Sequence, residues 1–203
     1  MKLYNSNLAP NARRVRIFLA EKGVAIPRVD IDLAKMEHKT PEYSARNPFL
    51  RVPALELDDG TVICESIAIC RYIEELHPEP NLFGAGARER ALIEMWQRRL
   101  ELHLFFPIAQ AFRHSHPHMA EMEKPQVAEW AAVNRPRALE AMAIIDQALG
   151  DRSYIAGDRF TVADITGLVA LDFVKPARIV IPPEFERLNR WRAALAARPS
   201  AAA

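Results

Sequence analysis

The chain has 203 residues, of which 50% are hydrophobic and 26% charged, and its formal net charge is +1. This balance excludes the strongly basic surface of a nucleic-acid-binding protein. The absence of a long uncharged apolar run or a signal-peptide core argues against a membrane span or secretion. Since Cys64 and Cys70 form no CxxC motif, we predict a reduced, cytoplasmic protein.

The first thirty residues predict a βαβ unit. Residues 2–5 form a short strand, and Asn11 is the expected N-cap of a helix that ends at Gly23. Alternating apolar and polar residues over 28–33 predict a second strand. Because this helix buries its apolar side, the arginines are expected on solvated faces. They are Arg13, Arg14 and Arg16.

The segment 47–73 predicts a hairpin followed by a helix. Residues 51–57 and 61–64 read as strands joined by an Asp-Asp-Gly turn. Pro53 interrupts the first strand, which predicts an edge position or a cis bond. Ser66 lies where the two-residue alternation of a strand is replaced by apolar residues at helical spacing. It should therefore occupy a helix N-terminus, which favours an anion. The complete order, βαβ–ββα, is that of a thioredoxin-like domain.

The remainder of the chain predicts an all-α domain. A Pro/Gly-rich linker over 79–86 separates domain 1–78 from domain 87–203. Pro107 and Pro136 should kink two long helices. A last feature is a capping box, formed by Thr161 and Asp164, at the start of an apolar central helix. The expected helices are 88–114, 126–149, 165–173 and 184–197.

Four motifs carry a family resemblance: NARRVRIFLAEKG at 11–23, NPFLRVPAL at 47–55, ESIAICRYIEE at 65–75 and IAGDRFTVADI at 155–165. In this order the chain resembles a soluble, cytosolic-type glutathione transferase, bacterial and theta/nu-like. The resemblance implies an N-terminal thioredoxin-like domain that holds glutathione and an all-helical domain with an apolar acceptor pocket. It also implies a cytoplasmic homodimer without metal, nucleic-acid or membrane partners.

The resemblance assigns roles in glutathione binding to individual residues. The backbone of Val52, ahead of a cis Pro53, would pair with the cysteinyl part. Ser66 would take the γ-glutamyl carboxylate, and Glu65 would face the γ-glutamyl ammonium. The glycine carboxylate would be met by basic groups: His38, Lys39 and Arg51.

The position that many relatives use to stabilise the thiolate departs from the pattern. Ala9 occupies the usual Ser or Cys position and carries no donor. Tyr4 lies where tyrosine-using classes place theirs, but the surrounding motif is absent. We therefore hypothesise that Asn11, backbone N–H groups at the helix start, and Ser6 stabilise the thiolate, because neutral donors and a helix dipole lower a thiol pKa.

The acceptor pocket should include aromatic residues of the first helix in the second domain, namely Phe105, Phe106 and Phe112. The nearby tract His114–His118 is broken by a proline and reads as a polar loop rather than a metal site.

Three functions remain open. The leading one is a transferase of detoxification type, in which the bound glutathione thiolate attacks a small apolar electrophile. The alternatives are a glutathione-dependent disulfide reductase and a non-catalytic ligand-binding or interaction protein. A maleylacetoacetate isomerase is disfavoured, because its Ser-Ser-Cys run is replaced here by Ala9-Pro10-Asn11.

Overall fold

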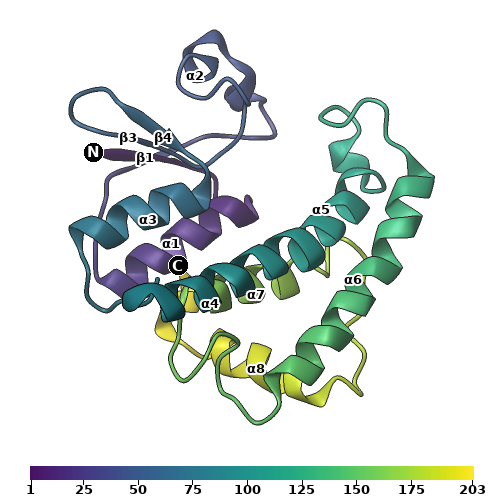
Figure 1. Cartoon of the computed structure of the whole chain (residues 1–203). Coiled ribbons are helices and arrows are strands. Elements are labelled where there is room, and N and C mark those ends of the chain that lie inside the picture. The colour runs from purple at the N-terminus through teal and green to yellow at the C-terminus, as the bar shows by residue number, and fades with distance from the viewer. The chain divides into compact units, whose positions relative to one another are not determined.

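A computed structural model describes all 203 residues, which form two compact units (Figure 1). The first unit contains residues 1–82 and 199–203, and the second contains residues 83–198. No helix combines the length and apolarity needed to cross a membrane.

The first unit is built on a four-stranded mixed sheet with the order β2-β1-β3-β4. Strand β1 runs parallel to β2, and β3 runs antiparallel to both β1 and β4. The predicted βαβ–ββα order is therefore confirmed. The strands are shorter than predicted, in part because Pro53 has no N–H to extend β3. Their bounds are β1 Lys2–Asn5, β2 Arg28–Asp30, β3 Ala54–Glu56 and β4 Val62–Cys64.

Two long helices, α1 and α3, lie side by side against this sheet (Figure 1). Helix α1 ends at Gly23, whose left-handed φ of 63° terminates it as predicted. The prediction that Asn11 caps the helix is wrong. The N-cap is Ala9, because Pro10, with its fixed φ, begins the helix one residue before Asn11. The helices of this unit are α1 Pro10–Lys22, α2 Pro41–Ser44 and α3 Ser66–Leu76, with 3₁₀ turns at Glu37–Lys39 and Pro199–Ala202.

The prediction that the arginines of α1 share a solvated face is wrong for two of the three. Arg14 is 2% exposed and Arg16 is 7% exposed. Their guanidinium groups are buried because they bind polar groups of the chain. Arg14 donates to Asn11 Oδ1 (2.7 Å), and Arg16 donates to Asn5 Oδ1 (2.7 Å).

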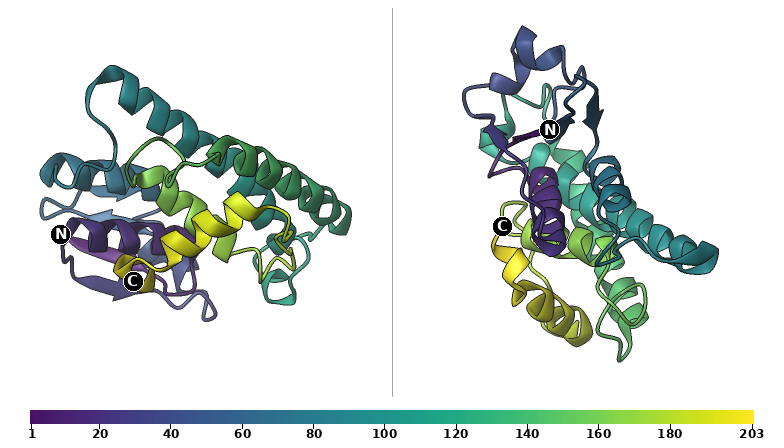
Figure 2. Two further views of the ribbon diagram at one scale, coloured as in Figure 1. Left: turned by 90° about the horizontal axis from the view of Figure 1, so that it is seen from below. Right: turned by 90° about the vertical axis from the view of Figure 1, so that its left-hand side faces the viewer.

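A buried ion pair fixes the segment that leaves α3. Lys22 Nζ contacts the Glu74 carboxylate and donates to the carbonyls of His77 (2.8 Å) and Pro80 (2.6 Å). Glu74 Oε1 accepts the N–H of Leu82 (2.9 Å). The C-terminal residues 199–203 also belong to this unit and pack on α1 (Figure 2).

The second unit is all-helical. The predicted helix 88–114 is divided by a π-helical segment that ends just before Pro107, where a backbone donor is missing. Helix α6 runs through Pro136 without a break, so a full interruption there is not observed. The bounds are α4 Gly86–Arg99, the π segment Leu100–Phe105, α5 Phe106–Arg113, a 3₁₀ turn Pro117–Met119, α6 Ala128–Leu149, α7 Val162–Asp172 and α8 Glu186–Ala196.

Helix α7 is the centre of the second unit, and its residues 162–171 are all buried. The predicted capping box is confirmed. The Asp164 carboxylate accepts the N–H of Thr161 (2.9 Å), the N–H of Ile155 (3.0 Å) and the indole N–H of Trp191 (3.0 Å). Gly167 leaves room for the same indole, since a Cβ there would lie 2.1 Å from a Trp191 ring carbon. Asp164 thus joins three segments.

Asp164→Ala should reduce the free energy of unfolding by about 3 kcal/mol or more, because several buried donors lose their acceptor. Chemical denaturation of the full chain measures this loss. Asp158→Ala is the matched control, since Asp158 is exposed, and it should change stability by less than about 0.5 kcal/mol. Equal losses in the two variants would contradict a special role for Asp164.

Candidate functional site

The strand register brings three separate segments to one edge of the sheet. Tyr4 pairs with Ala54, and Ala54 pairs with Cys64. Because both pairings are antiparallel, the residues that follow β1, precede β3 and follow β4 meet at the same edge. The predicted site residues at these three points are Ser6, Val52 and Ser66.

Val52 presents its backbone at this edge. The peptide bond to Pro53 is cis, as predicted, and neither the N–H nor the C=O of Val52 makes a hydrogen bond in the structure. The preceding carbonyl, that of Arg51, is held by Tyr43 Oη (2.6 Å) and Asn47 Nδ2 (2.8 Å). Burial raises the pKa of Tyr43, so its hydroxyl remains a donor. These two side chains, which the sequence did not reveal, fix the backbone before Val52.

The N-terminus of α3 is the second component. Glu65 is its N-cap and has a φ of 68°, a left-handed conformation that is uncommon for a residue with a side chain. Ser66 begins the helix, is buried, and its hydroxyl makes no hydrogen bond. Because the first turn contains no acidic residue, its free N–H groups and the helix dipole can accept an external anion.

Three predicted basic residues also lie near one another. His38 is 2% exposed, and its Nδ1 atom is buried without a partner. Burial lowers the pKa of His38, and the charges of Lys39 and Arg51 lower it further. His38 is therefore neutral at pH 7, while the two neighbouring cations supply the positive potential.

The N-terminus of α1 is the third component. The N–H of Ala9 donates to the Ser6 carbonyl (3.1 Å), which closes a tight turn before the helix. Pro10 has no N–H, so the free donors of the first turn are the N–H groups of Asn11 and Ala12. Ala9 is buried in the apolar cluster that also contains Val52, and it offers no donor.

The side chain of Asn11 has a defined orientation. Its Oδ1 atom accepts a hydrogen bond from Arg14 Nη2 (2.7 Å), and a guanidinium can only donate. The Nδ2 donor of Asn11 consequently remains available for another acceptor. Ser6 is buried, and its hydroxyl makes no hydrogen bond.

Arg16 stabilises the turn before α1 through hydrogen bonds. Its Nη1 atom donates to Asn5 Oδ1 (2.7 Å) and to the Ser6 carbonyl (3.1 Å), and its Nη2 atom donates to the Asn7 carbonyl (3.4 Å). Asn5 Nδ2 in turn donates to Asp30 Oδ1 (2.6 Å). A buried cation and a buried amide thus determine the conformation of the loop that faces the site.

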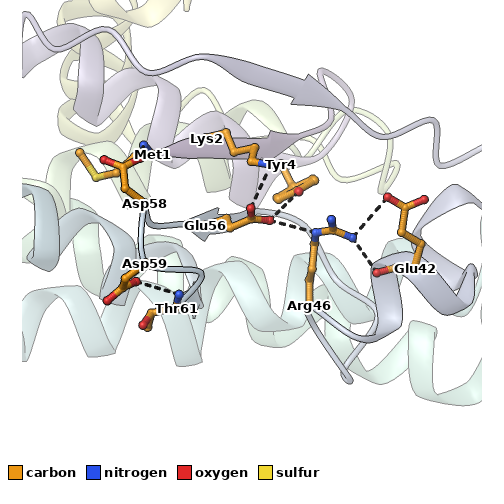
Figure 3. A network of polar contacts seen from close by, with 9 residues as sticks. All are labelled: Met1, Lys2, Tyr4, Glu42, Arg46, Glu56, Asp58, Asp59 and Thr61. Atoms are coloured by element: carbon orange, nitrogen blue, oxygen red, sulfur yellow. Dashed lines mark hydrogen bonds and ion pairs between the residues drawn. The ribbon is translucent and has the colours of Figure 1, made fainter.

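The hydroxyl of Tyr4 takes part in a polar network away from the candidate site (Figure 3). Its hydroxyl donates to the Glu56 carboxylate (2.7 Å), which also binds Lys2 (2.9 Å) and Arg46 (3.0 Å). Hydrogen bonds from Lys2, Tyr4 and Arg46 lower the pKa of Glu56 to about 2. Burial, together with this bond, raises the pKa of Tyr4. The tyrosine is therefore a structural donor and is not available to stabilise a thiolate.

The three predicted pocket phenylalanines do not form one group. The rings of Phe105 and Phe112 both contact Phe173, with centroid distances of 6.2 and 5.0 Å. Phe106 is 49% exposed and lines a groove between the π segment and α6. The sequence did not single out Phe173, although it lies just after the apolar helix α7.

The histidine tract forms local turns. His114 Nδ1 accepts the N–H of Val127 (3.1 Å), and His116 Nδ1 accepts the N–H of His118 (3.3 Å). No group of three or more His, Cys, Asp or Glu side chains is placed to hold a metal ion.

Comparison with known proteins places this arrangement in a family. A model of the glutathione S-transferase N-terminal domain matches residues 9–76, and a model of the C-terminal domain matches residues 99–199. The chain belongs to the glutathione S-transferase family. It is 41% identical to glutathione S-transferase 2 of Saccharomyces cerevisiae, covering 98% of this chain and 87% of the relative.

Two further relatives are also similar to the chain over most of its length. A crystal structure of a glutathione S-transferase domain-containing protein from Marinobacter aquaeolei superposes with a TM-score of 0.95 at 40% identity, covering 98% of this chain and 99% of the other. The maleylacetoacetate isomerase of Pseudomonas aeruginosa is 31% identical over 81% of this chain and 77% of its own length.

The network around Glu56 predicts a pH effect on stability. Since folding lowers the pKa of Glu56 from 4.5 to about 2, its contribution is present above about pH 4.5 and is lost as the pH falls through 2. Glu56→Gln removes this contribution, so the variant should lose stability less steeply than the unmodified protein between about pH 5 and pH 2. Denaturant titrations across this range measure the slope.

Glu75→Gln is the control for this experiment, because Glu75 is exposed and makes no hydrogen bond or ion pair. A Glu56→Gln slope that matches both the control and the unmodified protein would contradict the role assigned to this network.

Proposed function

We propose that this protein is a glutathione transferase whose first unit binds glutathione. One observation carries the proposal: the turn before α1, the backbone of Val52 and the N-terminus of α3 meet at one edge of the sheet. Glutathione is a peptide-like molecule with two carboxylates, an ammonium and a thiol. It needs a backbone partner, anion sites and an acid close together, and these three segments supply them.

The γ-glutamyl and cysteinyl parts have complementary groups. The unused N–H and C=O of Val52 are suited to pair with the cysteinyl backbone. The free hydroxyl of Ser66 and the first N–H groups of α3 can bind the γ-glutamyl carboxylate. Glu65, which is exposed, can meet the ammonium.

The glycine carboxylate would lie near His38, Lys39 and Arg51. The mutual electrostatic effect of these groups supports a common positive region. A neutral His38 can donate one hydrogen bond, while the two cations provide the charge.

The thiolate would be stabilised without a catalytic base. A free thiol has a pKa of about 8.5 and is mostly protonated at neutral pH. The Nδ2 group of Asn11, the N–H groups of Asn11 and Ala12, and the hydroxyl of Ser6 are unused donors near the start of α1. Preorganised donors and a helix N-terminus stabilise an anion more than a neutral thiol, so they lower its pKa.

The bound thiolate would then attack a small apolar electrophile. At carbon, a C–S bond forms as the leaving group departs with the electrons of the broken bond; at a disulfide sulfur, a new S–S bond forms as the other sulfur departs as a thiolate. Phe105 and Phe112, which converge on Phe173, support an apolar acceptor region in the second unit. We leave Phe106 out of this region because it lines a different groove. The occupied hydroxyl of Tyr4 supports a class that does not use tyrosine, such as the theta/nu-like type. The homodimer and the cytoplasmic location stay predictions.

Ligand binding and turnover test the proposal. The protein should be retained on immobilised glutathione, and Ser66→Ala should weaken binding about tenfold because a hydrogen bond to a charged group is lost. Ser153→Ala, at an exposed serine without a hydrogen bond, should bind normally. Turnover of chlorodinitrobenzene supports a transferase, and turnover of hydroxyethyl disulfide alone indicates a reductase. Binding without either activity would contradict catalysis and favour a carrier.

The assignment of the thiolate donors has its own test. Asn11→Ala and Ser6→Ala should each raise the pKa of the bound thiol, by about one unit for a lost hydrogen bond to the anion. The ultraviolet absorbance of the thiolate, titrated against pH, measures this pKa. Leu8→Ala changes the same loop at an exposed side chain and should leave the pKa unaltered. If both donor variants keep the pKa of the unmodified protein, the assignment is wrong.

A further inference from the structure

The first unit contains a cavity of about 220 Å³ whose lining residues have no part in the glutathione-binding assignments. Its apolar lining includes Leu19, Val24 and Ile26. Two arginines, Arg16 and Arg28, line the same cavity. An aliphatic surface beside two cations is suited to a ligand with an apolar body and an anionic head.

Arg16 has hydrogen-bonding capacity left for such a ligand. A guanidinium carries five N–H donors, and three of them are used by Asn5, Ser6 and Asn7. Two donors remain on a side chain that is almost fully buried and therefore held in position. The loop contacts thus orient Arg16 and leave two of its N–H donors unused.

Arg28 provides the second cation. It is exposed at the start of the edge strand β2, and its guanidinium makes no hydrogen bond or ion pair. Burial lowers the pKa of Arg16, and the charges of Arg28 and Arg13 lower it further. Asp30 is the one acidic group that acts in the opposite direction, and its Oδ1 atom already accepts from Asn5. Arg16 and Arg28 thus bring two positive charges to the cavity, and Asp30 is the acidic side chain that opposes them.

We propose that this cavity binds a medium-chain monocarboxylate, with the carboxylate between Arg16 and Arg28 and the chain over Leu19, Val24 and Ile26. Drug-sized ligands occupy pockets of about 300–1,000 Å³, so the smaller volume here favours a single short chain. Ala203 also lines the cavity, and it forms no ion pair with either arginine.

Ligand binding in this cavity can be tested independently of the proposed glutathione function. Its ligand would contact Arg16, which also donates hydrogen bonds to the carbonyls of Ser6 and Asn7. Binding should therefore change the NMR signals of the loop before α1. Octanoate is the probe, and it is titrated into the full chain with and without saturating glutathione. The expected result is binding under both conditions, so that a failure of glutathione binding leaves this test intact.

Calorimetry measures the affinity, and methyl NMR locates the ligand. Octanoate should shift the methyl signals of Leu19, Val24 and Ile26 and the amide signal of Asn7. Arg28→Gln should weaken binding by about tenfold, the effect of losing a charge-assisted hydrogen bond. Arg88→Gln, at an exposed arginine of the second unit that makes no hydrogen bond or ion pair, should bind like the unmodified protein.

Octanol keeps the apolar chain without the charge, and inorganic phosphate is an anion without the chain. Each should bind at least about tenfold more weakly than octanoate. The proposal is overturned if Arg28→Gln binds octanoate as tightly as the unmodified protein. It is equally overturned if the methyl shifts fall only in the second unit, or if millimolar octanoate gives neither heat nor shifts. Because Arg28 is exposed, its variant should retain the fold, which circular dichroism verifies.

Discussion

The antiparallel pairing of β3 with both β1 and β4 is the constraint on which the candidate site depends. This pairing places the end of β1, the start of β3 and the end of β4 at one edge of the sheet. Each strand is only three or four residues long, so the chain leaves the sheet at once and offers free backbone groups. Pro53 prevents the hairpin from continuing into Val52, whose N–H and C=O consequently remain unpaired.

The groups at this edge are mostly donors held by neighbouring side chains. Two helices begin there, and neither has an acidic residue in its first turn that would neutralise its dipole. Buried polar side chains fix the intervening loops: Arg16 holds the turn before α1, and Asn47 with Tyr43 holds the carbonyl before Val52. Burying these groups is costly, and their hydrogen bonds to backbone carbonyls and to the Asn5 amide offset part of that cost. The favoured chemistry is therefore anion stabilisation by preorganised donors, without a general base.

The sequence predicted the features that local rules determine. The βαβ–ββα order, the helix start at Ser66 and the Thr161–Asp164 capping box follow from periodicity and capping preferences, and all are observed. For Pro53, proline chemistry left an edge position or a cis bond open, and the family resemblance implied the cis bond that is observed. The burial of Arg16 could not be read in this way. An arginine on an amphipathic helix usually faces solvent, and only the folded loop reveals the carbonyls that it binds.

The division among the pocket phenylalanines was missed for a similar reason. Phe105 and Phe106 are adjacent in the chain, so on a helix they point about 100° apart, and only the packing of Phe173 shows which of them joins Phe112. Amide NMR of the protein titrated with glutathione tests the central claim most directly. The account predicts that the amides of Val52, Ser66, Asn11 and Ala12 shift together at one binding constant. Binding that shifts Val52 and Ser66 but leaves Asn11 and Ala12 unmoved would contradict it.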